Sequence, residues 1–219
     1  MSAFLRSFLR SFLRLAALLV ALTAHPFACA DDAVDFFRAV NVDDDRTVKT
    51  LLARGFDPNT TNPRGQPGLF VALRDESPKV AAALVAHPAI RVDATTAADE
   101  TALMVAALRG NLEWTRRLLD LGAALNRPGW TALHYAASGP DLMVLKLLLE
   151  RGAQIDALSP NRSTPLMMAA GYGPHESALW LLAGGASRLL RNDRDMSAAD
   201  FARSVGRDGL ALQLEPPAR

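Results

Sequence analysis

A repeat of about 33 residues is the feature that most constrains the fold of this chain. The segments 101–123, 131–153 and 164–186 have equal length and align without gaps, as TALMVAALRGNLEWTRRLLDLGA, TALHYAASGPDLMVLKLLLERGA and TPLMMAAGYGPHESALWLLAGGA. One alanine recurs in phase along the chain, at intervals of 33, 34, 30, 33 and 33 residues: Ala39, Ala72, Ala106, Ala136, Ala169 and Ala202. Units this short cannot bury their apolar side chains alone, so the pattern predicts a stack of copies.

The sequence of each unit predicts two short helices joined by a tight turn. In the clearest copy, Thr131 is a suitable N-cap residue for a first helix, and Gly139-Pro140 ends it after about two turns. The second helix, 142–150, is rich in leucine. Gly152 follows it where a left-handed C-cap is expected, because glycine adopts a positive φ without a steric penalty.

These units resemble the ankyrin repeat, whose consensus is close to TPLHxAAxxGHxEVVxLLLxxGADVNA. Weaker copies occupy 34–56 and 67–89, and a shortened one occupies 197–214. The resemblance implies an all-α ankyrin-repeat solenoid of about six helix-turn-helix units, linked by β-hairpin-like turns, over residues 31–214. Residues 215–219 are expected to be a frayed C-terminal tail.

One inter-repeat segment is shorter than the others. In most of the chain, the Thr position that begins a unit lies eight residues after the Asn/Asp position that ends the unit before it. Thr131 lies only five residues after Asn126. The loop at this place is therefore expected to be blunt, with Pro128-Gly129 forming its turn.

Residues 1–30 have the pattern of a secretory signal peptide. Arg6, Arg10 and Arg14 form a positively charged start, residues 15–22 are apolar, and Ala28-Cys29-Ala30 is an A-x-A cleavage site. We expect cleavage after Ala30 and a periplasmic or secreted protein. A lipoprotein modified at Cys29 is the alternative. A membrane anchor is less favoured, because the apolar run is short for a bilayer.

Charge and residue types argue against several functions. Removal of the three leader arginines leaves 21 basic and 23 acidic residues, a net charge of −2, with no basic run typical of nucleic-acid binding. The only cysteine lies in the leader, and no histidine has metal-ligand or catalytic-triad spacing. We therefore expect no enzyme, metal or cofactor. The family resemblance implies a structural role for His134.

The positions that the repeat leaves free indicate function. Just after the Thr-x-Leu-His block, five of the six free positions hold apolar or aromatic residues. The free positions at the end of the first helix add Leu108 and Tyr172 together with charged residues, so an apolar strip is rimmed by charge. This composition is typical of a protein interface. A groove without a partner, or packing between inner helices, is the alternative. The predicted protein-binding residues on the concave groove are Val71, Val105, Leu108, Arg109, Trp130, Tyr135, Met168, Tyr172 and Phe201.

The resemblance implies a monomeric, non-enzymatic interaction module. The role expected from similar secreted bacterial proteins is that of an accessory or scaffold partner of another exported protein. An immunity or inhibitor protein that masks an exported toxin or hydrolase is the second hypothesis. An enzyme with an unrecognised site is the third.

Overall fold

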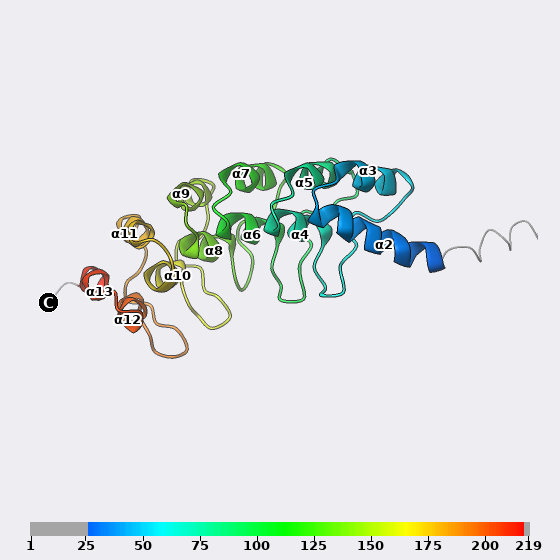
Figure 1. Ribbon diagram of the computed structural model, residues 1–219. Helices are drawn as coiled ribbons and strands as arrows, with labels where there is room; N and C mark the ends of the chain where they lie inside the picture. Colours follow the sequence, from blue (N-terminus) through cyan, green and yellow to red (C-terminus); the bar gives the residue numbers. More distant parts are fainter. Residues whose placement is uncertain (1–25, 217–219) are drawn as a thin grey trace, which may run out of the picture.

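The computed structural model describes residues 26–216, which form twelve α-helices and no strand. The helices are paired into six consecutive units (Figure 1). The pairs are α2 (Pro26–Asn41) with α3 (Asp45–Ala53), α4 (Gly68–Arg74) with α5 (Pro78–Val85), α6 (Ala102–Leu108) with α7 (Leu112–Asp120), α8 (Ala132–Ser138) with α9 (Leu142–Glu150), α10 (Pro165–Tyr172) with α11 (His175–Ala183), and α12 (Ala198–Ser204) with α13 (Asp208–Leu214). The predicted six helix-turn-helix units are confirmed.

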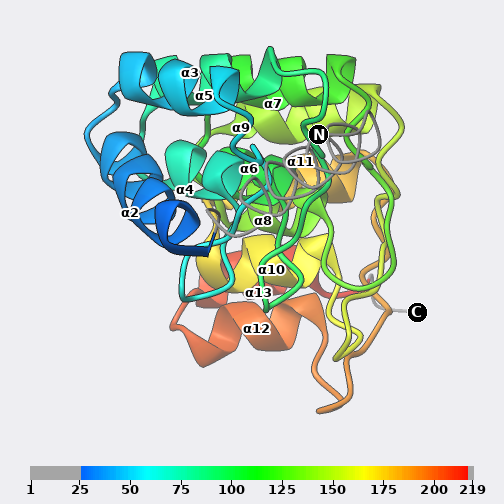
Figure 2. The same ribbon diagram turned by 90° about the vertical axis from the view of Figure 1, so that its right-hand side faces the viewer.

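The first helices of the units form one layer and the second helices form another. Hairpin loops between units project together on one side of the first helices (Figures 1 and 2). In the described part of the chain, β-structure is limited to isolated bridges that pair Thr61 with Pro67 and Thr95 with Thr101. The hairpin loops therefore have the predicted hairpin-like form without extended strands.

Local sequence explains where the helices begin and end. Thr101 and Thr164 are the N-cap residues of α6 and α10, and each side chain accepts a hydrogen bond from the backbone N–H three residues later at 3.3 Å. At the other end of a unit, Gly152 has φ +91°. The N–H of Ala153 then reaches Leu148 O at 3.0 Å, which satisfies a free carbonyl of α9. The predicted left-handed cap is confirmed.

The core lies between the two layers. Each recurring alanine is at most 3% exposed, and leucines such as Leu118, Leu148 and Leu181 are fully buried. Small residues let the first helices of neighbouring units approach closely. A Cβ added at Gly173 would lie only 1.9 Å from Ala137 O, so no larger residue fits there without movement of the backbone.

Asn and Asp side chains connect the bases of successive hairpin loops. The Oδ1 atoms of Asn59, Asp93, Asn126 and Asp156 each accept a backbone N–H of the following unit, at 2.7–2.9 Å. The donors lie 28 to 32 residues later in the chain. These bonds set the spacing of the loops independently of the loop tips.

The predicted leader lies mostly outside the described residues. Of the predicted cleavage site, Ala28, Cys29 and Ala30 fall within α2, which is continuous from Pro26 to Asn41. Cleavage after Ala30 would shorten this helix by its first five residues. Among the described residues, no helix combines the length and apolar character needed to cross a bilayer. The last three residues of the predicted tail, 217–219, lie outside the described part.

Candidate functional site

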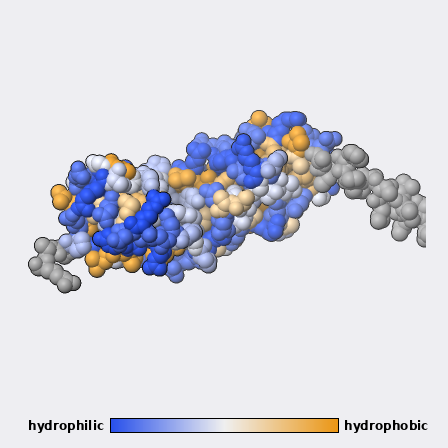
Figure 3. All heavy atoms as spheres, turned by 90° about the horizontal axis from the view of Figure 1, so that it is seen from below, coloured by the Kyte–Doolittle hydropathy of each residue, from blue (hydrophilic) through white to orange (hydrophobic). Residues whose placement is uncertain are grey.

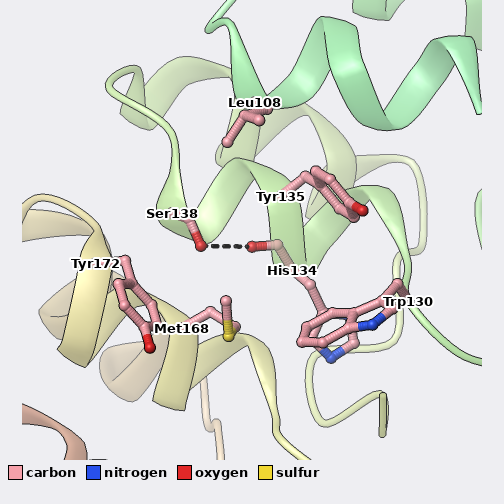
Figure 4. Close-up of a pocket in the computed structure, with 7 residues that line it drawn as sticks. All are labelled: Leu108, Trp130, His134, Tyr135, Ser138, Met168 and Tyr172. Carbon is pink, nitrogen blue, oxygen red and sulfur yellow. Dashed lines mark hydrogen bonds between the residues drawn. The ribbon is translucent and has the colours of Figure 1, made fainter. Parts of the chain in front are cut away.

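A pocket of about 340 Å³ opens where three units meet, at the ends of α6, α8 and α10 and the hairpin loop before α8 (Figure 4). Apolar and aromatic side chains make up most of its wall. Its lining residues are Leu108, Trp130, His134, Tyr135, Ser138, Met168 and Tyr172. The view from the side of the hairpin loops shows a mostly hydrophilic surface with smaller hydrophobic areas between the polar ones (Figure 3).

The short hairpin loop before α8 places Trp130 in this pocket. Each of the other four loops has eight residues, and a backbone bond at 2.9–3.1 Å closes its tip. In these bonds the fourth residue donates to the eighth: Asn62 to Gln66, Thr96 to Glu100, Ser159 to Ser163 and Asn192 to Met196. The loop before α8, residues 126–130, has only five residues and forms no such bond. Arg127 instead holds this loop against the preceding one, because its guanidinium donates to Asp99 O and Oδ1, both at 2.7 Å.

Tyr135 joins the pocket to the preceding hairpin loop. Its hydroxyl donates to Glu100 Oε1 at 2.9 Å, and its ring is almost perpendicular to that of Trp130, with centroids 6.4 Å apart. Burial, the hydrogen bond to Glu100 and the nearby acidic charges raise the pKa of Tyr135. The hydroxyl therefore remains a neutral donor, and the ring is held in one orientation.

His134 forms the buried floor of the pocket. Its Nδ1 accepts the Thr131 N–H at 3.2 Å, so in the neutral ring Nε2 carries the hydrogen and donates to Ser163 O at 3.0 Å. Burial lowers the pKa of His134, which favours this neutral form. Met104 and Met167 occupy the same position in neighbouring units, and each sulfur accepts the equivalent N–H at 3.4 Å. His134 thus has a structural role, and methionine in the neighbouring units makes the first of its two hydrogen bonds.

Five of the predicted binding residues lie together in the pocket: Leu108, Trp130, Tyr135, Met168 and Tyr172. Leu108 is 39% exposed and Tyr172 is 62% exposed. Phe201 is adjacent, because its ring centroid lies 6.5 Å from that of Tyr172. His134 and Ser138 also line the pocket but are not among the predicted binding residues. His134 was assigned to the framework, whereas Ser138 occupies one of the free positions at the end of the first helix.

Three predicted residues do not join this surface. Val71 and Val105 are only 1% and 5% exposed, so their prediction as groove residues needs correction. The first helices pack so closely that a side chain as small as valine at this position is covered by its neighbours. Arg109 lines a separate depression between the helix turns of two units, where its guanidinium donates to Arg74 O at 2.7 Å.

The chain matches the family described as "Ankyrin repeats (3 copies)" over residues 36–128 and again over 124–193. Together these matches cover well over half of the chain. The protein belongs to the ankyrin-repeat family. Proteins of this family are generally non-enzymatic interaction modules, and ankyrin repeats mediate binding to other proteins.

Three relatives of this ankyrin-repeat protein show how far the similarity extends. An ankyrin repeat-containing protein of Treponema pallidum (strain Nichols) is 35% identical over 109 residues, which are 48% of this chain and 37% of that protein. The E3 ubiquitin-protein ligase XB3 of Oryza sativa subsp. japonica is 35% identical over 97 residues, 42% of this chain and 22% of the ligase. The B-cell lymphoma 3 protein homolog of Mus musculus is 27% identical over 164 residues, 72% of this chain and 37% of the relative.

The aligned parts thus make up only 22% to 37% of these relatives. The similarity concerns the repeats that they share. Within residues 26–216, no group of three or more His, Cys, Asp or Glu side chains is placed to bind a metal ion.

Proposed function

We propose that this ankyrin-repeat protein binds another protein through the pocket formed by α6, α8, α10 and the short hairpin loop before α8. The observation that carries the proposal is the gathering of Trp130, Tyr135, Tyr172, Met168 and Leu108 around one opening. Aromatic side chains in a partly exposed cavity are typical centres of protein interfaces. The shortened loop lowers the wall beside Trp130, so a partner can approach the first helices more closely there.

The proposed partner is another exported protein, for which this chain acts as an accessory or scaffold. Support for export comes from the leader-like residues 1–30, with the A-x-A site at Ala28-Cys29-Ala30. The exported form should begin at Asp31, which N-terminal sequencing of the protein from the cell envelope would show. A mature form that begins at a lipid-modified Cys29 would instead establish the lipoprotein alternative.

The binding proposal is tested by changing both Trp130 and Tyr135 to alanine in the mature chain. Each anchor in such a centre contributes about 2 kcal/mol or more, so the double variant should lose most partner recovery in a pull-down from cell-envelope extract. Circular dichroism and the melting temperature should change little, because both side chains are only partly buried.

The control is the double variant Leu189→Ala and Leu212→Ala, which removes two apolar side chains that are 69% and 68% exposed and lie outside the pocket. Unchanged recovery with the Trp130 and Tyr135 variant would contradict the proposal. If a recovered partner is a toxin or hydrolase whose activity falls on binding, the role is that of an immunity or inhibitor protein.

A further inference from the structure

We propose that the pocket accepts a bulky apolar side chain from a partner segment that carries a lysine or arginine next to it, and that this cation pairs with Glu100. The inference rests on the proposed function, since it specifies the chemistry of the partner at the same pocket. Two independent features of the pocket carry it: the apolar lining and the charge at one edge.

The lining selects an apolar side chain. None of the seven lining residues carries a formal charge, given that His134 is held neutral by its two hydrogen bonds. Covering Tyr172 and Leu108, which are 62% and 39% exposed, removes apolar surface from water, and this is favourable in proportion to the area covered. A volume of about 340 Å³ is large enough for an aromatic or branched aliphatic side chain.

The charge at the edge of the pocket is negative. Glu100 accepts the Tyr135 hydroxyl through Oε1 and is only partly buried. In the described part of the chain, its carboxylate makes no ion pair with a lysine, arginine or histidine. The neighbouring Asp99, by contrast, is paired with Arg127 at 2.7 Å. Glu100 is therefore the carboxylate at this edge that a partner cation can neutralise.

Nearby arginines are engaged elsewhere, which removes the main competition for Glu100. Arg109 donates to Arg74 O, and Arg127 donates to Asp99. The charges of Glu100 and Asp99 both contribute to the raised pKa of Tyr135. The Glu100 carboxylate beside the Tyr135 hydroxyl therefore favours a basic over an acidic partner segment.

The inference is tested by selecting peptides from a random phage-displayed library on the mature protein and discarding those that still bind the Trp130→Ala variant. The remaining peptides should contain a bulky apolar residue next to lysine or arginine. A second selection on the Glu100→Lys variant should enrich aspartate or glutamate at the same place. The charge-matched control is Glu150→Lys, an exposed change on α9, which should leave the basic preference intact.

Affinities of one selected peptide give the quantitative check. Replacing its basic residue by alanine should weaken binding to the wild-type protein by about two- to fivefold, the range of a partly exposed ion pair. The same replacement should have no effect on binding to Glu100→Gln. Added salt should weaken binding to the wild-type protein more than binding to Glu100→Gln, because mobile ions screen this pair.

The two proposals fail in different ways. Peptides that depend on Trp130 but show no excess of lysine or arginine would overturn the charge inference and leave the binding proposal in place. Failure of Glu100→Lys to change the selected charge would do the same. If no peptide depends on Trp130, the pocket is not a peptide-binding site and both proposals are overturned.

Discussion

The neighbouring hairpin loops before α6 and α8 both connect one unit to the next, but they differ in length and in the bonds that hold them. The loop before α6 has a full tip, in which Thr96 N–H bonds to Glu100 O at 2.9 Å and Asp99 adopts a positive φ of 61°. The loop before α8 lacks three residues and has no such closing bond. It rests on the longer loop instead, through the ion pair of Arg127 with Asp99.

The base of the short loop is nevertheless unchanged. Asn126 accepts the Gln154 N–H at 2.9 Å, just as Asp93 accepts the Ala124 N–H at 2.9 Å in the unit before. Asn126 also donates to Gly152 O at 2.9 Å. The deletion therefore affects only the part of the loop that projects into solvent. In this short loop the bonds at the base, made by Asn126, hold units together, whereas the tip beside Trp130 shapes the surface proposed to bind a partner. The tip can therefore vary while the bonds at the base are kept.

The largest effect is expected from the framework of the short-loop unit. Leu148→Ala removes a fully buried side chain of α9 and should lower the free energy of unfolding by about 2–5 kcal/mol, measured by urea denaturation. Met143→Ala on the same helix is the control, because Met143 is 52% exposed and its loss should have little effect. Equal stability of both variants would contradict the separation of framework from surface.

A smaller effect is expected from acidification, through His134. Burial lowers the pKa of this side chain in the folded protein, so below about pH 6.5 the unfolded chain binds a proton that the folded protein does not. The contribution of neutral His134 is complete above that pH and is lost as the pH falls toward the folded-state pKa. The free energy of unfolding should therefore decrease from about pH 7.5 to pH 5.

The matched variant is His134→Met, because methionine accepts the same backbone N–H in the neighbouring units. Its stability should depend less on pH over this interval than that of the wild-type protein. The pH dependence of the two proteins can be compared over this interval, because the aspartates with lowered pKa values titrate at lower pH. These are Asp44, Asp75 and Asp200. Parallel pH curves for the two proteins would show that His134 is not the titrating group.

The fold could be predicted from sequence because six copies in phase repeat the same caps and apolar positions. Gly152 and the recurring alanines are examples in which one residue type satisfies one local geometry. The pocket could be predicted in part: the missing residues before Trp130 pointed to it. The burial of Val71 and Val105 could not be predicted from the sequence, because it depends on how closely neighbouring helices approach. His134 was assigned only to the framework, although one residue can both bridge units and line a cavity.

The smallest effect on stability should come from restoring the missing loop tip. Inserting Gly-Asn-Gly after Arg127 returns the spacing to that of the other loops and keeps Trp130 and Tyr135 in the chain. Loop-closure entropy rises slowly with length, so the free energy of unfolding should fall by less than about 1 kcal/mol. Binding through the pocket should fall much more, because the added residues rebuild the wall beside Trp130.

The same insertion after Arg194, in the loop before α12, is the control for a longer loop away from the pocket, and partner recovery should then be unchanged. A loss of several kcal/mol with the insertion after Arg127 would mean that the length of this loop holds units together and that the bonds of Asn126 are not sufficient to do so. Full binding with unchanged stability would mean that the low wall is not what admits the partner. Only weakened binding at nearly constant stability agrees with a deletion that shapes the surface and leaves the solenoid intact.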